Sequence, residues 1–82
     1  MDRRPDVGQK FKLKPTARVE WLAWAHLDQT CVRAVRMDHP YGKALAEWVA
    51  NDRNGLPPFN RIQLTQVSKE FWLHDLKSAV LA

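Results

Sequence analysis

Histidine and cysteine side chains are the residues of this chain best suited to hold a metal ion or act as a nucleophile. The sequence contains three histidines, His26, His39 and His74, and one cysteine, Cys31. Zinc sites use closely spaced pairs such as CxxC or HxxxH, and neither spacing occurs here. A cysteine nucleophile needs a histidine base oriented beside it, and no local signature around Cys31 indicates one. The spacing therefore predicts neither a metal site nor a cysteine nucleophile.

Glycines and carboxylates could support phosphate binding or acid–base catalysis. Gly8, Gly42 and Gly55 lie far apart, so no glycine-rich loop that would cradle a phosphate is present. The carboxylates are scattered through segments that have the pattern of solvated faces. We therefore predict a protein that is not an enzyme, with no catalytic residues and no cofactor.

Basic side chains are the more informative set, because the formal net charge is +4. In the stretch KFKLKP, three lysines alternate with Phe11 and Leu13, which is the period of a β-strand. Lysines on an edge strand prevent sheets from pairing edge to edge, and this role alone explains the pattern. If the cations converge on one face, they form a surface for phosphates or for an acidic partner. The candidates for that surface are Lys10, Lys12, Lys14, Arg33, Arg36, Arg53 and Arg61.

Aromatic residues supply a second kind of candidate site. Four tryptophans in 82 residues are many for so small a core, and one that stays exposed would make a protein-binding anchor. Phe59 follows two prolines in the loop 51–59, and loops of this length are often functional. Tyr41, Phe59 and Trp72 are therefore predicted as anchors for a protein partner, and an exposed Tyr41 or Phe59 could also stack on an unpaired base.

Length and composition place these residues in one small domain. A chain of 82 residues with 45% hydrophobic and 27% charged residues is typical of a single globular domain. We expect residues 10–82 to form it, after a flexible N-terminal arm, 1–9. A lone cysteine suits a reducing compartment, and no segment has the ~18 apolar residues of a membrane span. The prediction is a cytoplasmic protein with no membrane contact.

Periodicity and turn residues assign the secondary structure in part. We predict strands over 10–14 and 60–66, which alternate, and a helix over 17–27, which begins after Thr16 as N-cap. The segments 30–37 and 44–50 fit either a strand or a helix. The last segment, 67–76, fits a strand followed by a turn, or else the start of a helix that continues to residue 82.

These elements can be combined into two architectures. The favoured one is an α+β fold: a small antiparallel sheet, or partial barrel, with strands 10–14, 30–37, 44–50 and 60–66 and one helix inserted after the first strand. The alternative is a mainly α fold with three helices, which the alanine-rich segments favour locally.

The quoted segments also resemble a known group of proteins. VGQKFKLKP, TCVRAVR, AEWV before NDRNG, and EFWLHDL are similar to the strands of small SH3-like barrel proteins of bacteria and phages. The resemblance covers most of the chain, although Ala34 and Ala46 stand where bulky strand residues are usual. It implies a small barrel, and such barrels bind nucleic acids and proteins alike.

Two functions follow as expectations. The first is a non-enzymatic binding module whose basic surface contacts nucleic acid or a nucleic-acid-handling complex. The second is a phage or mobile-element protein that inhibits or adapts a host protein complex, for example an anti-defence inhibitor, through protein–protein contacts. A protein partner, nucleic acid and a homodimer are all retained as alternatives for the partner.

Overall fold

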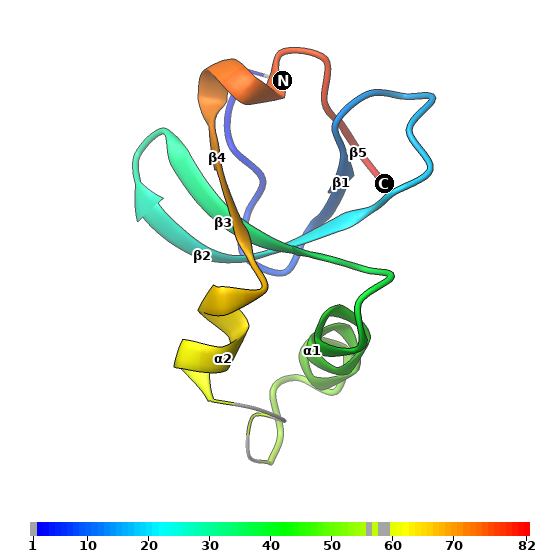
Figure 1. The fold of residues 1–82 in the computed structure, drawn as a ribbon, viewed down its shortest axis with the longest axis vertical. Helices are drawn as coiled ribbons and strands as arrows, with labels where there is room; N and C mark the ends of the chain where they lie inside the picture. The colour runs from blue at the N-terminus through cyan, green and yellow to red at the C-terminus, as the bar shows by residue number, and fades with distance from the viewer. Residues whose placement is uncertain (1, 56, 58–59) are drawn as a thin grey trace.

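The chain folds into a curved five-stranded antiparallel sheet with helices on one side (Figure 1). The computed structural model describes residues 2–55, 57 and 60–82. Within them the strand order is β4-β3-β2-β1-β5. The elements, in chain order, are β1 Lys10–Lys12, β2 Trp21–Asp28, β3 Cys31–Arg36, α1 Pro40–Ala50, α2 Arg61–Gln66, β4 Lys69–Trp72, the 3-10 turn η1 Leu73–Leu76, and β5 Val80–Leu81.

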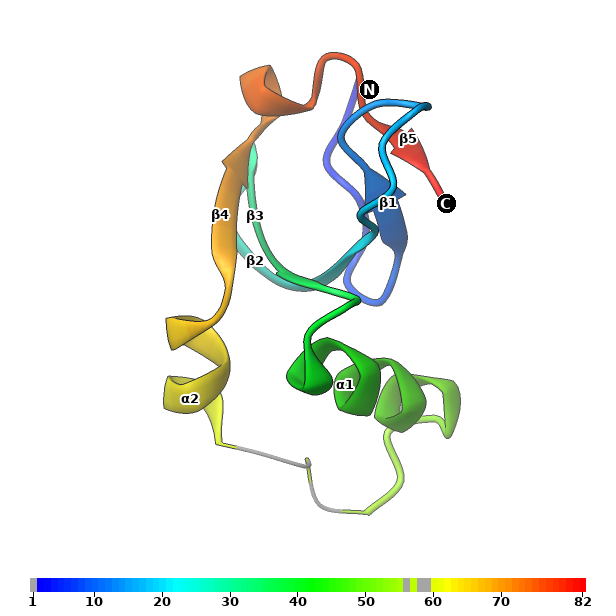
Figure 2. The same cartoon turned by 45° about the vertical axis from the view of Figure 1, so that its right-hand side comes forward.

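The sheet buries side chains on both of its faces. Figures 1 and 2 show it curving so that β4 and the β1–β5 pair stand on opposite sides of a concave face, while α1 and α2 lie beyond the other face. The concave core is formed by Phe11, Trp21, Ala23, Val32, Ala34, Phe71, Leu76 and Ala79. The helix-side core is centred on Leu22, Val35, Leu45 and Leu64.

Aromatic rings fill the concave core. The Trp21 and Phe71 rings meet edge to face at 4.8 Å between centroids, and Phe11 meets Phe71 in the same way at 5.7 Å. Ala23 and Ala34 are paired across β2 and β3, and both are fully buried. Small residues at this pair leave the space inside the curve to the three rings.

The predicted helix over 17–27 is wrong, because most of that segment is β2. Trp21, Leu22 and Ala23 are all buried, although successive side chains of a strand point to opposite faces. A strand with a core on each face shows a continuous apolar run, and such a run cannot be distinguished from a buried helix by period. The expectation of strand for 30–37, by contrast, is confirmed by β3.

The two segments predicted as strands over 44–50 and 60–66 are helical, and these predictions are wrong. α1 begins at Pro40, whose fixed φ suits the first helical position, and the His39 side chain accepts from the Tyr41 backbone N–H. α2 begins after Asn60, whose side chain accepts from the Gln63 backbone N–H. Both helices therefore follow the third strand, whereas the predicted helix followed the first.

The α+β class is confirmed, and the three-helix alternative is wrong. The final segment is a strand and a turn, β4 and η1, rather than a helix to residue 82. β4 and β5 are each paired on one side only, so the sheet is open.

β1 is not an edge strand, contrary to one explanation of its lysines. It pairs with β2 on one side and with β5 on the other. The segment before it, expected as a flexible arm, contacts the sheet through Gly8 N–H to Ala23 O at 2.8 Å and a buried Pro5. The His26 ring nitrogen Nε2 also lies 2.8 Å from Pro5 O.

Candidate functional site

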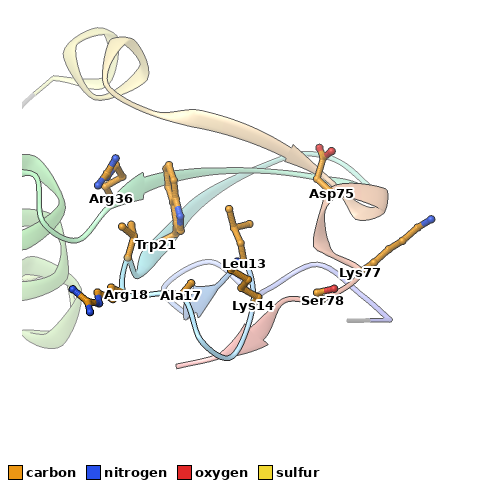
Figure 3. A pocket seen from close by; sticks show the side chains of 10 residues that line it. Leu13, Lys14, Ala17, Arg18, Trp21, Arg36, Asp75, Lys77 and Ser78 are labelled. Atoms are coloured by element: carbon orange, nitrogen blue, oxygen red, sulfur yellow. The ribbon is translucent and has the colours of Figure 1, made fainter.

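An open hollow of about 500 Å³ lies at one end of the concave face, and we call it the Trp21 hollow (Figure 3). It is bounded by the connection between β1 and β2, the first residue of β2, the last residue of β3, and the end of the chain from η1 to β5. Its lining residues are Leu13, Lys14, Ala17, Arg18, Val19, Trp21, Arg36, Asp75, Lys77 and Ser78.

Strand pairing places the centre of this hollow. Trp21 pairs with Phe11 of β1 and with Arg36 of β3, so these three side chains share the concave face. The connection from β1 to β2 turns where the Ala17 N–H donates to Lys14 O at 3.0 Å. This turn brings Lys14 and Arg18, four residues apart, to the same opening.

The middle of the hollow is apolar and contains one polar group. Leu13 and Val19 are half-buried against the concave core, and Trp21 is 9% exposed. The Trp21 indole N–H makes no hydrogen bond with the described residues, none of which has a buried side-chain nitrogen or oxygen without a partner. Solvent must therefore reach this N–H, and the hollow is the opening that Trp21 lines.

The charges around the hollow are mostly positive. Lys14 and Arg18 are exposed and form no ion pair in the described part of the chain. Arg36 is engaged, because its guanidinium binds both oxygens of Asp38 at 3.0 and 2.8 Å. The hydrogen bond and charge of Arg36 hold the pKa of the Asp38 carboxyl below its usual range.

Asp75 is the carboxylate that lines the hollow. One of its oxygens accepts from the Trp72 backbone N–H at 2.9 Å, which joins η1 to the end of β4. The other lies 3.5 Å from the Nε2 of His74. Asp75 thus has a structural role in the turn, and it lowers but does not cancel the positive charge of the lining.

The predicted cations are divided among three places. Of the predicted set, Lys14 and Arg36 line the Trp21 hollow. Lys10 and Lys12 remain on β1, and Lys10 borders a shallow depression beside the C-terminal residues. The three other arginines, Arg33, Arg53 and Arg61, lie on the helix side of the sheet, and two of them stand over the ring of one tryptophan.

That tryptophan is Trp24, whose ring has Arg33 and Arg61 over it at 5.6 and 5.7 Å from the centroid. Arg33 also forms an ion pair with Glu70 at 2.9 Å, so its charge is compensated. Arg53 and Arg61 line a second hollow of about 350 Å³ between the helices and β2.

The two predicted protein anchors that the structure describes, Tyr41 and Trp72, lie on different elements. Tyr41 packs against the helix-side core at the start of α1. Trp72 is 42% exposed at the end of β4. Phe59 lies outside the described residues.

Arg18, Lys77 and the role of Trp21 were not predicted. The signal for Arg18 was present, since Pro15 and Thr16 mark a turn between two strands once 21–28 is recognised as a strand. Trp21 was one of the four tryptophans counted in the sequence and was not singled out as a site residue. Lys77 carries no local signal, because it reaches the hollow through the long-range pairing of β5 with β1.

The residues with metal or redox chemistry stay apart in the structure. Among the described residues, no three histidine, cysteine or acidic side chains are grouped as a metal ion requires. Burial raises the pKa of the Cys31 thiol, which disfavours the reactive thiolate. Within the same residues, no helix has the length and apolar character needed to cross a membrane.

No protein-family model matches the chain, and neither the curated proteins nor the solved structures give a match.

Proposed function

We propose that the protein is a binding module for nucleic acid, alone or within a nucleoprotein complex, and that the Trp21 hollow is its contact site. The observation that supports this most is the position of Lys14 and Arg18. Both are exposed cations without an ion pair among the described residues, and both border an open hollow with an apolar middle. Unpaired cations at an opening attract phosphates, whereas paired surface cations do so weakly.

In this proposal each part of the lining has its own task. Lys14 and Arg18 bind phosphate oxygens and release the counterions that surround a nucleic acid. Arg36 is held in its orientation by Asp38, which accepts from two of its five N–H donors and leaves the other three for a ligand at the opening. No bond of the ligand is broken, so affinity and its salt dependence are the quantities that report function.

We also propose that the fold is an open variant of the SH3-like barrel. The support is the strong curvature of five antiparallel strands and the pairing of the first strand with the last. On this proposal, α1 and α2 are an insertion between the third and fourth strands. The segment AEWV, which was matched to a barrel strand, belongs to that insertion.

The test compares two charge reversals that change the net charge equally. Lys14→Glu acts at the hollow, and Lys43→Glu acts on an exposed residue of α1, on the other side of the sheet. Binding of a fluorescently labelled single strand of roughly 20 nucleotides would be followed by anisotropy at about 50 and about 200 mM salt.

We expect Lys14→Glu to weaken binding about tenfold or more and to reduce the salt dependence, while Lys43→Glu changes affinity by no more than about threefold. Equal losses in both variants would mean that net charge alone attracts the ligand. Absence of binding by the unaltered protein at the lower salt concentration would refute the proposal.

A second candidate function is inhibition or adaptation of a host protein complex, as a phage or mobile-element protein would do. One observation favours it: Trp72 is exposed on β4, which is an edge strand of the sheet. Exposed tryptophans are frequent anchors in protein interfaces. Trp72→Ala would then abolish partner capture from a host extract and leave nucleic-acid binding unchanged.

A further inference from the structure

We propose that the Trp21 hollow recognises single-stranded rather than duplex nucleic acid, by accepting one unpaired base between two phosphate contacts. This rests on the proposed function and specifies the class of ligand. Three features of the hollow support it: exposed cations beside an apolar centre, an indole N–H without a partner among the described residues, and the volume of the opening.

The lining of the hollow has apolar residues in its middle and charged residues at its sides. Figure 3 shows Trp21 and Leu13 in the middle, with Arg18 and Arg36 on one side of them. Asp75 of η1 and Lys77 lie on the other side, where the Lys77 side chain extends away from the middle. Lys14 lies beside Leu13. Two exposed cations, Lys14 and Arg18, thus lie at different points of the opening beside an apolar centre. A nucleotide within a strand has a phosphate on each side of its base, so these two cations can contact its phosphates while the base enters the apolar centre.

Trp21 provides a hydrogen-bond donor that a base could use. Its N–H has no partner among the described residues, although the ring itself is held by Phe71. Every nucleobase presents at least one carbonyl oxygen or ring nitrogen that accepts a hydrogen bond. A base that enters the hollow would therefore satisfy this donor, whatever its identity, and the site would tolerate many sequences.

The size of the hollow and the access to it suit one unpaired base better than a duplex. A hollow of about 500 Å³ lies within the range of small-ligand pockets, so it has room for one base. Bases of a duplex are stacked and paired, and extruding one costs a few kcal/mol. A duplex would contact only Lys14 and Arg18 at the opening and would leave the apolar centre and the indole N–H unused.

The experiment uses the full chain and four labelled ligands of equal length. They are a mixed-sequence DNA single strand, the corresponding RNA strand, the DNA strand with abasic sites in place of its bases, and the DNA duplex. The abasic strand keeps the phosphates and removes only the bases. We expect the two normal strands to bind about tenfold more tightly than the abasic strand and the duplex.

Two variants connect that preference to the hollow. Trp21→Phe keeps an aromatic ring against Phe71 and removes the N–H, so the preference for normal over abasic strands should fall about fivefold, which corresponds to one hydrogen bond. Ala17→Phe keeps Trp21 and all the cations and fills the opening from its half-buried lining position. It should abolish the preference for normal over abasic strands. Because Ala17 lies in a connection between strands, this variant tests the inference even if Trp21→Phe does not fold.

The outcomes separate the inference from the function on which it rests. Equal affinity for normal strands, abasic strand and duplex overturns the inference and leaves nucleic-acid binding established. An RNA strand that binds like DNA indicates recognition of the base and phosphates, and a preference for either strand identifies the natural source. Absence of binding to all four ligands, with binding of a labelled polyglutamate peptide, overturns both and indicates an acidic protein partner.

Discussion

At the scale of single residues, Gly42 has the most restricted position of the three glycines. It is buried in α1, and a Cβ atom built on it would lie 2.0 Å from the backbone oxygen of Arg36 and 2.9 Å from the backbone carbon of that residue. The helix therefore passes against the end of β3 with no space for a side chain. This close approach fixes α1 next to Arg36, a residue of the Trp21 hollow.

Gly42→Ala tests this contact by the sign of its effect. Helix propensity alone predicts that alanine stabilises the helix by about 0.5–1 kcal/mol relative to glycine. Steric conflict with backbone atoms predicts the opposite, a loss of about 1–3 kcal/mol or more. We expect the loss, measured as the free energy of unfolding in urea. The exposed neighbour Lys43→Ala is the control and should change stability by less than about 0.5 kcal/mol.

At the scale of elements, α2 shows how a capping signal can outweigh an alternating pattern. Ile62 and Leu64 alternate with polar residues, which predicts a strand, yet Ile62 is 73% exposed and only Leu64 is buried. The sequence also contains asparagine followed three residues later by glutamine, the spacing of a helix start. In a segment of six residues the cap matters more, because few hydrogen bonds form within the helix.

We therefore expect Asn60→Ala to lower the free energy of unfolding by about 1 kcal/mol, since the Gln63 N–H would lose its acceptor at 2.8 Å. Asn60→Asp retains an acceptor oxygen and should keep most of the stability. Thermal and urea unfolding followed by circular dichroism would measure both variants. If alanine and aspartate were equally tolerated, the cap would contribute nothing to the stability of α2.

The strands show how far sequence reasoning could reach. β1 was predicted from its alternation, and the structure follows that alternation, because Phe11 is buried and Lys10 is exposed. β3 was recovered as the favoured alternative, and β2 was missed because its two faces contact different cores. Period alone cannot identify such a strand, and local helix propensity then prevails in the prediction.

Only part of the candidate site followed from the sequence. Lys14 and Arg36 were named, but their proximity depends on the pairing of β1, β2 and β3. Arg18 lies in the segment 17–27, which was predicted as a helix that does not form. Convergence of cations is a property of register and curvature, and neither can be derived from residue types without the correct strands.

At the scale of the whole molecule, one sheet supports two cores. Leu22 of β2 packs on the helix side and Ala23, its neighbour, on the concave side; Val35 and Ala34 of β3 do the same. Loss of either core would expose one face of the same two strands. For 82 residues the total stability is expected to be roughly 4–12 kcal/mol, which leaves little for a partly folded form.

We therefore expect the two cores to unfold together. Leu64→Ala removes a side chain from the helix-side core and Leu76→Ala removes one from the concave core, and each should cost about 2–5 kcal/mol. Ile62→Ala, on the exposed side of α2, is the matched control and should change stability by less than about 0.5 kcal/mol. Urea unfolding would be followed by circular dichroism and by tryptophan fluorescence, and the two signals should give one coincident transition in every variant. Separate transitions in Leu64→Ala, with the helical signal lost first, would show that the curved sheet and its Trp21 hollow persist without the helices.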